Sequence, residues 1–96
     1  MTEKQSWTKQ GEGWWALFHA SRDKHMSDEA FRVLGLVVNA AKVAGDNTCR
    51  LSNAEIGKRM TPQREAGVIQ EHLKALSAQG YLAWTGHGAS RELTAR

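Results

Sequence analysis

The chain has 96 residues, of which 41% are hydrophobic, and it carries a formal net charge of +3 with a pI of about 9.4. A chain of this length buries one modest core, so a single domain is expected. No apolar run approaches the roughly 20 residues of a membrane-spanning helix, and the first residues lack the apolar stretch of a signal peptide. These features predict a cytoplasmic protein with no membrane partner.

The positive charge lies in the second half of the chain. Residues 1–49 contain six Lys or Arg and six Asp or Glu, whereas residues 50–96 contain seven and four. Any surface that binds a polyanion is therefore expected in the second half.

Two N-terminal segments differ sharply in composition. Residues 1–12 are polar and lack an apolar period apart from Trp7, which predicts a flexible tail. Residues 13–96 then form the domain, which opens on an aromatic segment containing Trp14, Trp15 and Phe18. These rings are costly to leave in water, so we expect them to contact the core or a second protomer.

The first long helix is predicted over residues 28–44. Ser27 is an N-cap residue type, Asp28 and Glu29 complement the positive helix end, and Gly45 is a typical stop. Most positions between them are apolar, which predicts a central and nearly enclosed helix.

Two further helices follow a short segment. Residues 48–51 form a strand candidate, and Ser52 with Glu55 three residues later predicts a capping box that begins a helix over residues 53–60. Proline is favoured at the first position of a helix, so Pro62 predicts a third helix over residues 62–78 that stops before Gly80.

The last part of the chain predicts a β-hairpin. Residues 81–84 and 91–94 are strand candidates on either side of a loop rich in glycine. The expected fold class is mainly α with a small antiparallel β-hairpin (α+β).

The third predicted helix has the two faces of a DNA-recognition helix. Val68, Ile69, His72, Leu73 and Leu76 lie on one side by helical periodicity, while polar residues and Gly67 lie on the other. An interior glycine costs helix stability, which a close approach to a backbone or a phosphate would explain. Arginine and glutamine suit base edges, and lysine and arginine suit phosphates. The predicted DNA-binding residues are Lys58, Arg59, Thr61, Gln63, Arg64, Gly67, Gln70, Lys74, His87, Ser90 and Arg91.

Residues 51–62, 68–76 and 80–82 resemble the winged helix-turn-helix domains of bacterial regulators. Together with residues 21–27 and the first long helix, they look like the modules found in plasmid and phage replication and transcription regulators. The resemblance implies a three-helix core with a wing, a recognition helix at about 62–78 in the major groove, and a wing at 85–91 on the backbone or minor groove. Double-stranded DNA is the expected partner, and a homodimer is expected because one such domain buries little DNA surface. The aromatic segment is then expected as a core or dimer contact.

The sequence also bears on metal binding, on catalysis and on protein binding. His19, His25, His72, His87 and Cys49 show no spacing typical of a metal site, so neither a metal nor a cofactor is expected, and Cys49 is interpreted as a buried structural residue. No catalytic motif is present, so the protein is not expected to be an enzyme. The alternative is a winged-helix module that binds protein and not DNA, an interpretation that Glu65 and Glu71 favour because they repel phosphate.

Overall fold

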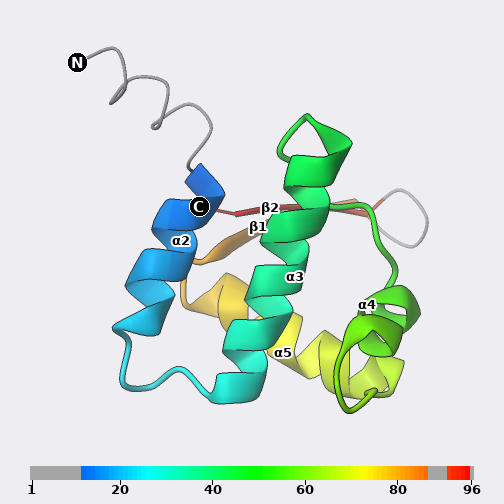
Figure 1. The fold of residues 1–96 in the computed structure, drawn as a ribbon, viewed down its shortest axis with the longest axis horizontal. Helices are drawn as coiled ribbons and strands as arrows, with labels where there is room; N and C mark the ends of the chain where they lie inside the picture. Colours follow the sequence, from blue (N-terminus) through cyan, green and yellow to red (C-terminus); the bar gives the residue numbers. More distant parts are fainter. Residues whose placement is uncertain (1–11, 87–90, 96) are drawn as a thin grey trace.

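The fold was obtained as a computed structural model that describes residues 12–86 and 91–95, with side chains described from residue 17 onward. Within these residues, four helices are followed by a two-stranded antiparallel sheet (Figure 1). The elements are α2 (Glu12–Ser21), α3 (Asp28–Ala44), α4 (Asn53–Arg59), α5 (Ala66–Ala78), β1 (Leu82–Thr85) and β2 (Glu92–Ala95). The expected α+β class is confirmed, whereas the predicted tail at residues 1–12 lies outside the described residues except for Glu12.

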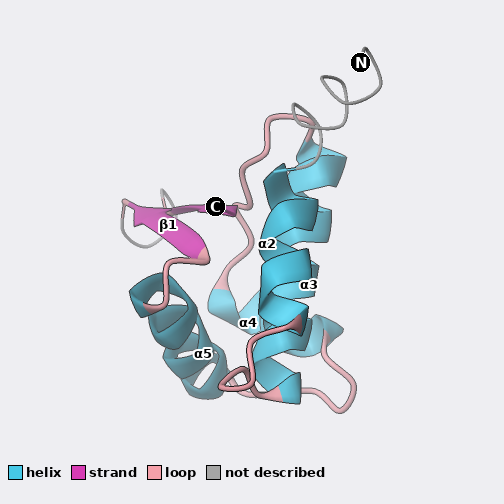
Figure 2. Ribbon diagram, turned by 90° about the vertical axis from the view of Figure 1, so that its left-hand side faces the viewer, coloured by secondary structure: helices cyan, strands magenta, loops and turns pink. Residues whose placement is uncertain are grey.

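Helix α3 lies at the centre of the fold and contacts α2, α4, α5 and β2. It begins where predicted, because the Ser27 side chain accepts a hydrogen bond from the backbone N of Ala30 at 3.1 Å. It ends at Gly45, whose φ of 84° is a left-handed conformation that glycine adopts without steric cost. Figure 2 shows α2 and α3 on one side of the molecule and α5 with β1 on the other.

Helix α2 contains the aromatic segment. No helix was predicted there from the sequence. Within it Ala20 is buried and Leu17 packs against the core. The helix therefore attaches to the domain through one side.

Helix α4 has the predicted capping box. The Ser52 side chain accepts from the backbone N of Glu55 at 3.1 Å, and the Glu55 carboxylate accepts from the backbone N of Ser52 at 3.0 Å. Two amide groups that the helix itself cannot pair are thereby satisfied.

Helix α5 begins at Ala66 with Glu65 as its N-cap, four residues later than predicted from Pro62. The prediction was wrong because a tertiary contact holds the connecting segment to α4: the backbone N of Arg64 donates to the carbonyl of Gly57 at 3.0 Å. Residues 60–65 therefore form a turn, and Gln63 and Arg64 belong to this turn, not to the helix.

The hairpin pairs Leu82 with Ala95 and Thr85 with Glu92, one residue away from the predicted strand limits. The predicted strand at 48–51 is reduced to one bridge, in which Cys49 and Leu93 exchange backbone hydrogen bonds of 2.8 and 3.0 Å. Cys49 is buried, as predicted, and burial raises the pKa of its thiol.

The core lies between α3, α4, α5 and the hairpin. Its largest fully buried side chains come from all of these elements. They are Val33, Leu34, Val37, Val38, Ile56, Ile69, Leu73, Leu76, Leu82 and Leu93, and Cys49 is buried beside them. Within residues 12–86 and 91–95, no helix combines the length and the apolar character needed to cross a bilayer.

Candidate nucleic-acid interface

Helix α5 has one buried face and one exposed face. Ile69, Leu73 and Leu76 are fully buried, which confirms their predicted core position. Val68 was also expected in the core but is 39% exposed, because it lies on the flank of the helix nearer solvent. The exposed face carries Gly67, with Glu71 and Lys74 on the following turn.

Gly67 is not required by the packing of the domain. A Cβ atom built at this position would meet no other atom within 4 Å. The missing side chain therefore leaves free space in front of the first turn of α5. An external partner could approach the backbone closely at this point.

Three exposed cations lie on α4 and α5. Lys58 and Arg59 end α4, and Lys74 lies on α5; all three are exposed. None of them forms a salt bridge with another residue in the described part of the chain. Their charges therefore remain available to a polyanion.

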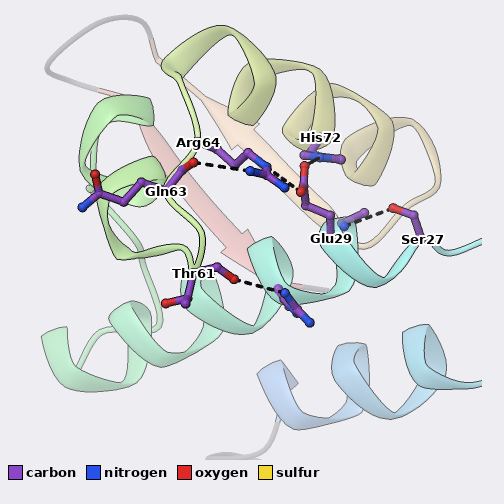
Figure 3. A network of polar contacts seen from close by, with 8 residues as sticks. Ser27, Glu29, Thr61, Gln63, Arg64 and His72 are labelled. Atoms are coloured by element: carbon purple, nitrogen blue, oxygen red, sulfur yellow. Dashed lines mark hydrogen bonds and ion pairs between the residues drawn. The ribbon is translucent and has the colours of Figure 1, made fainter.

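Arg64 forms an ion pair with another residue of the protein (Figure 3). Its Nε lies 2.6 Å from Oε1 of Glu29, and the other oxygen of that carboxylate lies 2.7 Å from Nε2 of His72. Hydrogen bonds from His72 and then from Arg64 lower the pKa of the Glu29 carboxyl. A DNA contact by Arg64 would compete with its bond to Glu29. This partner lies 35 residues away in the chain. It was not predicted, because in the sequence Glu29 indicates only the start of a helix.

The turn between α4 and α5 presents Thr61 and Gln63, both exposed. The side-chain nitrogen of Gln63 donates to the carbonyl of Lys58 at 3.2 Å, and the carbonyl of Thr61 accepts from Arg32 at 3.2 Å. These bonds attach the turn to α4 and α3, as Figure 3 shows for Thr61. The turn is thus held next to the start of α5.

A second polar network joins the hairpin, α4 and α5. Arg91, before β2, donates to Oδ1 of Asn53 and to the carbonyl of Leu51. The side-chain nitrogen of Asn53 donates in turn to Oε1 of Gln70 at 2.6 Å. The role of Asn53 was not predicted, because an asparagine at a helix start is ordinary in sequence.

Arg91 itself occupies an interior position. Only 7% of its surface is exposed, and its guanidinium lies 5.3 Å from the centre of the Trp84 ring. Burial lowers the pKa of Arg91. The prediction of a phosphate contact at Arg91 does not fit this position, since a phosphate could reach the guanidinium only if its internal bonds were broken. His87 and Ser90, predicted beside it, lie outside the described residues.

Of the predicted aromatic contact residues, the structure describes the side chain of Phe18. Phe18 is 47% exposed and lies under the guanidinium of Arg22, 5.1 Å from the ring centre. The side chains of Trp14 and Trp15 lie outside the described part of α2.

The described residues were also compared with the requirements of a metal site. Among the described residues, no three His, Cys, Asp or Glu side chains come close enough together to hold a metal ion.

Comparison of the chain with protein-family models, with curated proteins and with solved structures finds no match.

Proposed function

We propose that this chain is a winged helix-turn-helix protein that binds double-stranded DNA, with α5 in the major groove. The order of its elements supports this: α3, the Cys49 bridge strand, α4, a turn, α5 and a hairpin. In such a domain the second helix of the α4–turn–α5 unit enters the groove. The cellular role that fits is a transcription or replication regulator of a plasmid or phage, as the sequence resemblance implies.

The observation that carries the proposal is the division of α5 into two faces. Its inner face is fully buried at Ile69, Leu73 and Leu76, so the helix is fixed against the domain. Its outer face offers Gly67, with open space above it, and the free ammonium of Lys74. A rigid helix with a thin, polar outer face has the shape that the major groove admits.

Phosphate contacts come from the flanks of this helix. The proposed DNA surface consists of Lys58, Arg59, Thr61, Gln63, Gly67, Gln70 and Lys74. Lys58 and Arg59 suit phosphates, because they are exposed and make no salt bridge to the described residues. Arg64 joins this surface only if it leaves Glu29, and the wing residues His87 and Ser90 stay predictions.

A homodimer belongs to the proposal. Two copies related by a two-fold axis would place two α5 helices at half-sites about one helical turn apart. The ring of Phe18 on α2 is 47% exposed, which supports a protein contact at α2.

Duplex binding across a salt series tests the proposal. Fluorescence anisotropy with random duplex DNA compares the native protein with Lys74→Gln and with the matched control Lys24→Gln, which removes an exposed charge in the loop between α2 and α3. Each lost phosphate contact reduces the slope of log K against log salt by about 1, so Lys74→Gln lowers the slope and Lys24→Gln does not. Absence of binding even at low salt would contradict the proposal and favour a protein partner for the same surface.

A steric variant tests the approach at Gly67. Gly67→Gln adds a side chain where the protein leaves free space, so thermal stability should be kept while duplex affinity falls at least tenfold. Ala44→Gln is the matched control, because it places the same side chain at an exposed position at the end of α3. Unchanged affinity of the Gly67 variant would place the DNA elsewhere.

A further inference from the structure

Three side chains from three elements form one continuous hydrogen-bonded chain. Arg91, just before β2, donates to the side-chain oxygen of Asn53 at the start of α4. Asn53 donates from its side-chain nitrogen to Oε1 of Gln70 on α5, at 2.6 Å. The hydrogen-bonded chain therefore runs from the buried Arg91 to the half-buried Gln70, a residue of the proposed DNA surface.

The direction of this chain is set by the arginine. A guanidinium has five N–H donors and no acceptor, so the group that faces Arg91 must be an oxygen. Asn53 then has only its NH₂ group to offer Gln70, and Gln70 must answer with its oxygen. Arg91 cannot reverse this order, because it is buried, bonded also to the carbonyl of Leu51, and packed against Trp84.

The free end of the chain is the NH₂ group of Gln70. Gln70 is half-buried, and its Nε2 has no acceptor among the described residues. It lies one helical turn from both Gly67 and Lys74 along α5. The group that Gln70 offers outward is therefore a hydrogen-bond donor.

Bases in the major groove differ in whether they suit a group that only donates hydrogen bonds or an amide that uses both its N–H and its oxygen. Adenine presents one acceptor and one donor, and it suits a glutamine that can use both its oxygen and its nitrogen. Guanine presents two acceptors, N7 and O6, and suits a group that only donates. Oε1 of Gln70 is turned toward Asn53, so the group nearest the groove is an NH₂ with two N–H donors. Guanine offers this group two acceptors, whereas adenine and thymine offer one each, so Gln70 matches guanine best.

We propose that Gln70 is a specificity-determining residue that selects guanine at the base pair it contacts, with Asn53 as the positioning residue that fixes its amide. The inference rests on the proposed DNA binding and goes beyond it, since it names the base and the device that selects it.

The variant Asn53→Asp reverses the chain. A carboxylate only accepts, so the new side chain at position 53 still receives Arg91 but forces Gln70 to turn its NH₂ group inward. The oxygen of Gln70 then faces the groove and selects an amino group, N6 of adenine or N4 of cytosine. An aspartate in the first turn of α4 also suits the helix dipole, so the variant is expected to fold, which thermal melting checks.

Selection of binding sites from a randomised duplex library reads out the base. The native protein and the matched control Asn39→Asp, an exposed residue of α3, should enrich guanine at one position roughly tenfold over adenine. Gln70→Ala should lose the preference at that position, which identifies it, and Asn53→Asp should change it to adenine or cytosine. An Asn53→Asp protein that selects guanine as before would overturn the inference.

Side-chain amide exchange in the free protein separates the two proposals. NMR should show the NH₂ group of Asn53 protected from exchange and that of Gln70 exposed, with Gln70 protected in Asn53→Asp. The opposite pattern in the native protein would overturn the assigned direction whatever the DNA result. Absence of duplex binding by every protein would overturn the proposed function and the base selection with it, even where the exchange pattern is as expected.

Discussion

Gly57 offers the sharpest test of how the α4–α5 unit is held together. The residue lies inside α4, where alanine is favoured over glycine by about 1 kcal/mol, so helix propensity alone predicts that Gly57→Ala stabilises the protein. The structure predicts the opposite. A Cβ at this position would lie 2.1 Å from the carbonyl oxygen of Arg64 and 3.1 Å from its carbonyl carbon.

Both close atoms belong to the backbone, so no side-chain rotation relieves the contact. The turn would have to move by roughly 1 Å or more, because non-bonded atoms pack at about 3.5–4.0 Å. Overpacking of this kind costs about 1–3 kcal/mol, and loss of the Arg64 N–H bond to the Gly57 carbonyl costs about 1 kcal/mol more. After the gain in propensity, the free energy of unfolding should fall by about 1–3 kcal/mol.

Thermal and urea unfolding measure this effect. For a domain of this size each 1 kcal/mol shifts the Tm by about 4–8 °C, so Gly57→Ala should melt roughly 5–20 °C below the native protein. Gly35→Ala is the control, because it is the same change in a helix interior with nothing within 4 Å, and it should gain about 0.5–1 kcal/mol. A Gly57→Ala protein as stable as Gly35→Ala would refute the close approach of the turn to α4.

Three further changes test the cap, the core and the acid response. Ser52→Ala removes the capping box and should lower the free energy of unfolding by about 1 kcal/mol, measured by urea denaturation. Leu73→Ala should cost about 2–5 kcal/mol in the same assay, whereas Val68→Ala on the exposed flank should change it by less than about 0.5 kcal/mol. The folded pKa of Glu29 is held below its ordinary value of 4.5, so its bonds stabilise the protein above that pH and are lost as pH falls through the lowered pKa. Urea midpoints measured downward from about pH 5 should therefore fall less steeply for Glu29→Gln than for the native protein.

Each of these has a result that contradicts it. Equal stability of Ser52→Ala and the native protein would show that the capping box does not stabilise α4. Similar losses for Leu73→Ala and Val68→Ala would contradict the assignment of faces on α5. An acid response of Glu29→Gln as steep as that of the native protein would show that other carboxyl groups govern the low-pH limit.

Local patterns determined most of the secondary structure. The cap at Ser27, the stop at Gly45 and the capping box from Ser52 to Glu55 act through groups only a few residues apart, so α3 and the start of α4 could be predicted from the sequence. Periodicity likewise identified Ile69 and Leu73 as the buried side of α5.

Tertiary contacts decided what local patterns could not. Pro62 is a favourable helix start by itself, but the carbonyl of Arg64 rests on Gly57 and keeps residues 60–65 in a turn. The strand expected at 48–51 needs a partner along its length, and the hairpin supplies one only at Cys49.

The candidate site divides in the same way. Its exposed cations and Gly67 could be predicted, because exposure follows from the polar face of a helix. The state of Arg64, Gln70 and Arg91 could not, since their partners Glu29 and Asn53 lie 17 to 38 residues away in the chain. Sequence alone thus determined which groups the protein has, and only the fold decided which of them are engaged internally, because a hydrogen bond between distant residues depends on distances that no local pattern contains.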